Sequence, residues 1–300
     1  MEMIWLNGEV LPMADAKISV EDRGFQFADG VYEVIRIYNG RPFTLDEHLQ
    51  RLERSCAGIE LGEAFDREAL SAQIVRFVEA NGPVDGMVYL QVTRGVAPRN
   101  HIYPARMDPT LLFYTRPLDA APAPGQGEGV TLQSAPDERW KRCWIKAIAL
   151  LPNVLAKNAA IAAGADEAVF VDDGFVSECS ASNLFAIIGG KIITHPIGSK
   201  VLPGVTRLVL TQLAADLGIE WVERPMREAE AKAADELFIT STTRELNWVA
   251  NWDGRKIANA CGPVTRKLHE AFAAKVRRET RPLQEAPVTS SGRRALAPLP

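Results

Sequence analysis

The segment Trp144-Ile145-Lys146-Ala147-Ile148-Ala149-Leu150-Leu151 decides how this chain is interpreted, because it places one cation in an apolar run. We expect a buried strand here, and lysine is almost never fully buried unless another group pairs with it or uses it. An amine that sheds its proton near neutral pH is a nucleophile for Schiff-base chemistry. Taken alone, the segment more often indicates a strand-end lysine whose amine reaches solvent.

The composition is that of an ordinary globular protein, and 300 residues suit two domains. The formal net charge of −4 argues against nucleic acid as a partner. No apolar run has transmembrane length and no signal-peptide core follows the N-terminus, so we expect no membrane association and a cytoplasmic protein. The cysteines stand far apart without a CxxC pair, so neither a metal site nor a disulfide framework is expected. They are Cys56, Cys143, Cys179 and Cys261.

A small N-terminal α/β domain is expected over residues 1–118, where strand and helix patterns alternate. Asn7-Gly8 predicts a hairpin turn, and Thr44-Leu45-Asp46-Glu47 predicts a capping box that opens a helix. The other elements expected here are strands over Val31–Tyr38, Val88–Thr93 and Leu111–Thr115, and helices from Leu45 to about Gly58 and from about Asp66 to Asn81.

Residues 119–127 are the predicted interdomain linker, because Pro and Gly there deny both helical and ladder hydrogen bonds. A larger second domain is expected over 128–280. Residues 281–300 are rich in Pro, Ser, Arg and Ala and predict a disordered tail. The elements expected in the second domain are strands over Val130–Gln133, Ala168–Val171, Phe175–Ser177, Leu184–Ile188 and Lys191–Thr194, and helices near Ala156–Ala163, Val205–Leu217 and Pro263–Arg278.

Two segments of the second domain have features of an anion site. Leu202-Pro203-Gly204-Val205-Thr206-Arg207 precedes a helix whose first N–H groups can bind an anion. Phe238-Ile239-Thr240-Ser241-Thr242-Thr243 predicts a strand that ends in hydroxyl side chains, which suit phosphate. Arg51 on the first long helix can supply the countercharge. Each feature is common by itself at helix starts, turns or surfaces, so the prediction depends on their combination.

Glu178 ends a predicted strand and is followed by the small polar run Cys179-Ser180-Ala181-Ser182-Asn183. A carboxylate at the end of a strand usually lies at the surface. A buried one beside a basic heterocyclic nitrogen would keep that nitrogen protonated. A pyridoxal cofactor needs a Schiff-base lysine, such a carboxylate and a phosphate cup. The chain offers all three, which points to pyridoxal 5′-phosphate.

Six segments taken in order resemble the fold-type IV pyridoxal-phosphate transaminases. The resemblance covers about residues 3 to 278 and implies an α/β two-domain fold whose larger domain has a β-barrel-like core. The segments are Phe25-Gln26-Phe27-Ala28-Asp29-Gly30-Val31-Tyr32-Glu33, His48-Leu49-Gln50-Arg51-Leu52, Ile145-Lys146 with Leu151-Pro152-Asn153-Val154-Leu155-Ala156-Lys157, Asp172-Asp173-Gly174-Phe175-Val176-Ser177-Glu178 with Ser182-Asn183, Leu202-Pro203-Gly204-Val205-Thr206-Arg207, and Ser241-Thr242-Thr243.

The resemblance assigns a role to each of these positions. Lys146 forms the Schiff base and later shuttles the proton, and Glu178 pairs with the pyridine nitrogen. Leu202 packs on the ring. Five residues are assigned to the phosphate, and Val205 acts through its backbone N–H. They are Arg51, Val205, Thr206, Ser241 and Thr242.

A carboxylate trap is implied by Thr93-Arg94-Gly95-Val96-Ala97-Pro98-Arg99-Asn100-His101, which resembles a loop of the D-amino acid transaminases. In that subgroup, an arginine and a histidine from the neighbouring subunit join a tyrosine to hold the substrate carboxylate. Arg99, His101 and Tyr32 stand at those positions, so a homodimer is implied. Thr243 is assigned to the substrate as well. Arg36, on the same strand face as Tyr32, is a further candidate, in contact either with substrate or with a surface acid.

The implied activity is ping-pong transamination from a D-amino acid, such as D-alanine or D-glutamate, to a 2-oxo acid, such as 2-oxoglutarate or pyruvate. Three related activities stay open: a branched-chain L-aminotransferase, an (R)-amine transaminase and an aminodeoxychorismate lyase. A different class, a non-catalytic protein that has kept the fold, is opposed by Lys146, Glu178 and the phosphate cup. The preferred D-amino acid and the role of the tail do not follow from the sequence.

Overall fold

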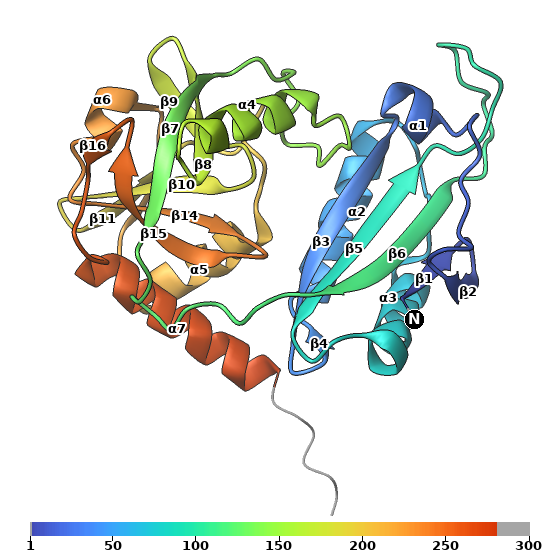
Figure 1. The fold of residues 1–300 in the computed structure, drawn as a ribbon, viewed down its shortest axis with the longest axis horizontal. Coiled ribbons are helices and arrows are strands. Elements are labelled where there is room, and N and C mark those ends of the chain that lie inside the picture. The colour runs from blue at the N-terminus through green and yellow to red at the C-terminus, as the bar shows by residue number, and fades with distance from the viewer. Residues whose placement is uncertain (1, 281–300) are drawn as a thin grey trace, which may run out of the picture.

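The computed structural model describes residues 2–280, which form two β-sheets with helices packed on them (Figure 1). The predicted disordered tail, 281–300, lies outside the described residues. The segment 118–129, which includes the predicted linker 119–127, contains no helix or strand and connects the two sheets. The observed mixed α/β architecture, with a curled second sheet, confirms the predicted fold class. The boundaries of the two domains stay a prediction.

The N-terminal sheet has six antiparallel strands in the order β2-β1-β6-β5-β3-β4. Its predicted strands and helices are confirmed to within a few residues, and a short helix, α1, was not expected. The elements are β1 (Met3–Leu6), β2 (Glu9–Pro12), α1 (Arg23–Phe27), β3 (Gly30–Tyr38), β4 (Arg41–Pro42), α2 (Leu45–Gly58), α3 (Arg67–Asn81), β5 (Gly86–Thr93) and β6 (Thr110–Pro117).

Strand β3 places its alternate residues on opposite faces of this sheet. Val31, Ile35 and Ile37 are fully buried in the core beneath α2 and α3. Tyr32 and Val34 face the other way, towards the second sheet, and line a cavity there. One strand therefore contributes both to the core and to the wall of the cavity.

The second sheet has ten strands in the order β12-β11-β10-β14-β15-β7-β8-β9-β13, with β16 paired to β15. Parallel strands β7 and β8 are joined through helix α4. The elements are β7 (Val130–Pro136), α4 (Leu151–Ala162), β8 (Glu167–Asp172), β9 (Phe175–Cys179), β10 (Asn183–Ile188), β11 (Lys191–Thr194), α5 (Val205–Asp216), β12 (Trp221–Glu223), β13 (Met226–Arg227), α6 (Glu228–Ala231), β14 (Glu236–Ser241), β15 (Glu245–Trp252), β16 (Arg255–Lys256) and α7 (Pro263–Glu279).

The two parts of the molecule meet at an aromatic contact. Tyr38 and Phe43, from the N-terminal part, lie in the same buried cluster as Phe272 of α7. The Phe43 ring packs edge-on against both other rings, with centroids 5.6 Å from Tyr38 and 5.8 Å from Phe272. This contact fixes the end of β3 against the second sheet, close to the cavity.

Two local predictions were wrong. The segment around Lys146 is not a strand: only Ala147 forms an isolated bridge, to Val31, and helix α4 begins at Leu151, earlier than expected, because Pro152 fits its first turn. Helix α2 does begin after Thr44, but Thr44 has φ +53° and its hydroxyl donates to the Phe43 carbonyl, so no capping box forms.

Candidate active site

A cavity of about 610 Å³ lies between the two sheets. Ten of the predicted site residues line it: Tyr32, Arg51, Lys146, Glu178, Leu202, Val205, Thr206, Ser241, Thr242 and Thr243. The three that do not are Arg36, Arg99 and His101. The structure thus brings together every residue that was assigned to the cofactor, from segments spread over the length of the chain.

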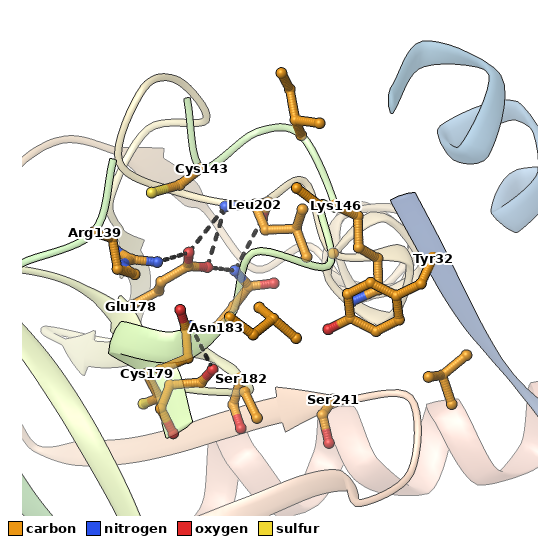
Figure 2. A pocket seen from close by; sticks show the side chains of 18 of the residues that line it. Tyr32, Arg139, Cys143, Lys146, Glu178, Cys179, Ser182, Asn183, Leu202 and Ser241 are labelled. Carbon is orange, nitrogen blue, oxygen red and sulfur yellow. Dashed lines mark hydrogen bonds and ion pairs between the residues drawn. The ribbon is translucent and has the colours of Figure 1, made fainter. Parts of the chain in front are cut away.

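Lys146 points into the cavity because its two neighbours point the other way. Ile145 and Ala147 are buried in the core of the N-terminal sheet, and an extended segment alternates its side chains. The Lys146 N–H donates to Ser55 Oγ at 3.1 Å, and its carbonyl accepts from the Tyr32 N–H at 3.0 Å. Its Nζ lies 4.2 Å from the centroid of the Tyr32 ring (Figure 2). The amine is therefore held at a defined place.

Glu178 stands near the end of β9 and is 5% exposed. Its carboxylate accepts hydrogen bonds from Arg139 Nη1 at 2.6 Å, from Asn183 Nδ2 at 2.9 Å and from the Leu202 N–H at 3.1–3.2 Å (Figure 2). Burial raises the pKa of Glu178 to about 7, although Arg139 and the Leu202 N–H oppose the rise. The carboxyl group is thus poised to change its charge near neutral pH.

Arg139 is a site residue that the sequence did not single out. It lies in the polar run Asp137-Glu138-Arg139-Trp140, where nothing distinguishes it from a surface arginine. In the structure its side chain is only 5% exposed, donates to Asp137 through Nε at 2.8 Å and Nη2 at 2.9 Å, and stacks over Phe170. The cation next to Glu178 is therefore itself held by a second carboxylate.

The predicted anion site forms where helix α5 starts and strand β14 ends. Gly204 is the N-cap of α5, and Val205 and Thr206 are its first residues. A Cβ at position 204 would lie 2.1 Å from Asn183 Oδ1, and Asn183 is fixed by its hydrogen bonds to Glu178 and the Leu202 carbonyl, so glycine is favoured there. Across from this turn, the loop between β14 and β15 presents Ser241 to Thr243 to the same cavity. Helix N–H groups and hydroxyls thus converge, as phosphate binding requires.

Arg51 is held by a buried acid. Its Nε and Nη2 each donate to Glu33 at 2.7 Å, and its Nη1 donates to the Pro203 carbonyl at 2.9 Å. His48 Nδ1 lies 2.7 Å from the same carboxylate. Burial alone would raise the pKa of Glu33, but Arg51 and His48 outweigh burial and lower it to about 2. A signal was present in the sequence, since Glu33 interrupts the inward-facing apolar row of β3.

Arg99 and His101 lie on an exposed loop away from this cavity. Arg99 stacks over Phe27 with its guanidinium carbon 4.4 Å from the ring centroid, and the His101 ring lies 5.6 Å from the same ring. Arg36 is buried, and its Nη2 donates to the Asp119 carbonyl at 2.8 Å rather than reaching the cavity. The substrate roles of these three residues stay predictions.

The residues of the cavity fit a pyridoxal phosphate group. The buried carboxyl of Glu178 matches a ring nitrogen that carries a proton, the amine of Lys146 lies across the same cavity, and the start of α5 forms an anion cradle, because it lines that cavity with the N–H groups of a first helical turn. Within residues 2–280, no group of three or more histidine, cysteine, aspartate or glutamate side chains is arranged to hold a metal ion.

The chain belongs to the aminotransferase class IV family, whose model matches residues 30–252, and the protein is therefore an aminotransferase. Among curated relatives, the D-alanine aminotransferase of Bacillus licheniformis is 42% identical over 278 residues, which cover 92% of this chain and 98% of that protein. The D-alanine aminotransferase of Staphylococcus aureus (strain N315) is 41% identical over 274 residues, covering 91% and 97%.

Solved structures share the fold at lower identity. The branched-chain aminotransferase of the thermophilic archaeon Thermoproteus uzoniensis, solved with norvaline, superimposes with a TM-score of 0.83 at 28% identity, covering 93% of this chain and 96% of that one. No helix within the described part of the chain is both long and apolar enough to cross a membrane.

Proposed function

We propose that this protein is a pyridoxal-phosphate-dependent D-amino acid transaminase that transfers an amino group from a D-amino acid to a 2-oxo acid. The observation that carries the proposal is the convergence of Lys146, Glu178 and the anion cradle on one cavity. The D-alanine aminotransferases, at 42% and 41% identity, support the D-amino acid class.

Each residue of the cavity has a definite task in this proposal. When bound, pyridoxal phosphate supplies an electrophilic carbon and an electron-accepting ring. Lys146 Nζ would hold the cofactor covalently and would take the proton from the substrate α-carbon. Ionised Glu178 keeps the ring nitrogen protonated. Arg51, Thr206, Ser241, Thr242 and the Val205 N–H hold the phosphate, while Leu202 packs on the ring.

Substrate binding is proposed to need a second copy of the chain. Arg99 and His101 lie off the cavity of their own chain, and their exposed loop is free to reach a neighbour. The neighbour's Arg99 and His101 would then join Tyr32 and Thr243 around the substrate carboxylate. Helix α4 adds a surface for such an assembly, because Leu151, Leu155 and Ile161 are more than half exposed.

A cytoplasmic location is also proposed. All four cysteines are free and buried, which suits a compartment that keeps thiols reduced. The division into a domain over 1–118, a linker over 119–127 and a domain over 128–280 is proposed as well.

The test is a half-reaction in which the cofactor's absorbance is followed after separate mixing with D-alanine, L-leucine and (R)-1-phenylethylamine. Rapid loss of the original band with D-alanine alone is expected. Loss with L-leucine or with the amine alone would place the protein among the branched-chain or amine transaminases.

Arg99→Ala tests the carboxylate trap. The variant should raise KM for D-alanine by about tenfold to a hundredfold, which corresponds to the loss of one charge-assisted hydrogen bond, while cofactor affinity stays unchanged. Unaltered kinetics would remove Arg99 from the trap.

A further inference from the structure

We propose that the hydrogen bond between Tyr38 and Glu245 holds the hydroxyl loop, defined as residues 241–243, in the position that binds the cofactor's phosphate. The inference deepens the proposed function and rests on it. It makes Tyr38 and Glu245 positioning residues, since neither lines the large cavity. The hydroxyl loop belongs to the second sheet, and Tyr38 of the N-terminal sheet would hold it in place.

The bond joins two parts of the chain that are 207 positions apart. Tyr38 is the last residue of β3, and Glu245 is the first residue of β15. The Tyr38 hydroxyl donates to Glu245 Oε1 at 2.8 Å, and both residues are buried. Burial and then Glu245 raise the pKa of Tyr38, so the phenol keeps its proton and remains the donor.

Glu245 sets the shape of the hydroxyl loop directly. It pairs with Ser241 at the base of the β14–β15 hairpin, so the loop closes on it. Its φ is +54°, in the left-handed region that glycine and asparagine favour. A non-glycine residue keeps such a backbone only where its surroundings over-determine it. We assign this constraint to the hydrogen bond that the Glu245 carboxylate accepts from Tyr38.

The back of the phosphate cup packs against the same tyrosine. A small void of about 10 Å³ is lined by Tyr38 together with Thr206 and Thr242, the two threonines that also line the large cavity. Such a void has room for about one water molecule, so Tyr38 stands immediately behind both threonines. Because Thr242 directly follows Ser241, which pairs with Glu245 across the hairpin, a shift of Glu245 moves Thr242.

The Tyr38 ring is itself firmly placed. Phe43 packs edge-on against it, and the Arg36 guanidinium carbon lies 5.2 Å from its centroid. On the far side of Glu245, His269 Nε2 lies 3.6 Å from Oε2. That separation is too long for a hydrogen bond, so among the described residues Tyr38 gives the side-chain hydrogen bond that holds this carboxylate.

The experiment compares two ligands that differ only in the phosphate. Cofactor-depleted Tyr38→Phe protein is titrated with pyridoxal 5′-phosphate and with pyridoxal, and binding is followed by the change in tryptophan fluorescence, to which Trp140 at the cavity contributes. The Kd for pyridoxal 5′-phosphate should rise about tenfold, the worth of one hydrogen bond to a charged group. The Kd for pyridoxal should stay the same, because only the phosphate contacts the hydroxyl loop.

Tyr103→Phe is the matched control, because the Tyr103 hydroxyl donates to Glu60 at 2.9 Å, likewise a tyrosine–carboxylate bond but an exposed one. It should change neither Kd. Adding Glu245→Met to Tyr38→Phe should weaken phosphate binding no further than the more severe single change, because both remove one contact. Should Tyr38→Phe fail to fold, Glu245→Met, which removes the accepting oxygen from a side chain of similar length, is judged by the same ratio of Kd values.

An equal loss for both ligands, or no loss for either, overturns the positioning role. Failure of the proposed function is a different result: the unaltered protein would then bind pyridoxal 5′-phosphate no better than pyridoxal. The opposite result, in which the unaltered protein binds pyridoxal 5′-phosphate more tightly than pyridoxal, is what the proposed function requires. If the Tyr38 and Glu245 variants keep that preference in full, only the positioning role is refuted.

Discussion

Replacing Glu33 by glutamine tests the buried network that holds Arg51. Glu33 is fully buried, and its two oxygens take hydrogen bonds from Arg51 at 2.7 Å. Glutamine keeps the shape of the side chain but leaves the guanidinium without a counterion. Breaking a buried pair by removing one partner typically costs about 3–5 kcal/mol. The variant should therefore be much less stable at neutral pH.

The pKa of Glu33 gives a second measure of how much the ionised Glu33 stabilises the folded protein. It is about 2, against 4.5 for an ordinary glutamate. Each pH unit of such a difference corresponds to about 1.4 kcal/mol, so ionised Glu33 contributes about 3 kcal/mol of stability above pH 5. Because the pKa is lower in the folded state, this contribution is lost as the pH falls, and about half should remain near pH 3.

The assay is denaturant unfolding of the cofactor-loaded protein and of Glu33→Gln at one protein concentration, between pH 7 and pH 3. The difference in unfolding free energy should be about 3 kcal/mol at pH 7 and shrink towards pH 3. Asp46→Asn, on the helix α2 that carries Arg51, is the control, because Asp46 and Arg67 form an exposed pair worth at most about 1 kcal/mol. A difference below about 1 kcal/mol at pH 7 for Glu33→Gln, or one independent of pH, would refute the reasoning.

Three further changes test the cavity. Lys146→Ala should abolish covalent attachment: borohydride reduction should no longer add the cofactor's mass to the chain, and an unchanged mass increase would contradict the assignment. Gly204→Ala should weaken cofactor binding by about tenfold or more, because its Cβ would lie 2.1 Å from Asn183 Oδ1, whereas Gly198→Ala, with open space around it, should not. Arg139→Met should raise the pKa of Glu178 above 7 by removing its countercharge, which a pH titration of the bound cofactor's absorbance would show; an unshifted midpoint would mean that Arg139 does not control Glu178.

The elements of the fold were largely predictable because their patterns are local. The alternation in β3 and the apolar face of α2 are properties of a few consecutive residues, and both elements form where expected. The Lys146 segment was mistaken for a strand because its apolar residues serve two purposes. Ile145 and Ala147 fill the core of the N-terminal sheet, while Leu150 and Leu151 lead into α4.

The candidate site was predictable where residue type and motif coincide and not where tertiary contact alone creates the role. Lys146, Glu178 and Thr206 stand in recognisable segments and reach one cavity. Arg139 became part of the site only because β9 passes beside it, 39 residues further along the chain. The position of Arg99 relative to a substrate depends on a second chain, and no pattern within one chain determines it.

Glu33 and Glu178 show how the surroundings of a carboxyl group decide what it can do. Both are buried beside an arginine, yet the pKa of Glu33 is about 2 and that of Glu178 is about 7. Arg51 gives two hydrogen bonds to Glu33, whereas Arg139 gives one to Glu178 and two to Asp137. Glu33 is therefore a permanent anion that fixes Arg51. Glu178 is left short of positive charge, and a protonated ring nitrogen in the cavity would supply it. Since interacting groups shift each other's titration, the ionised Glu178 would in turn keep that nitrogen protonated.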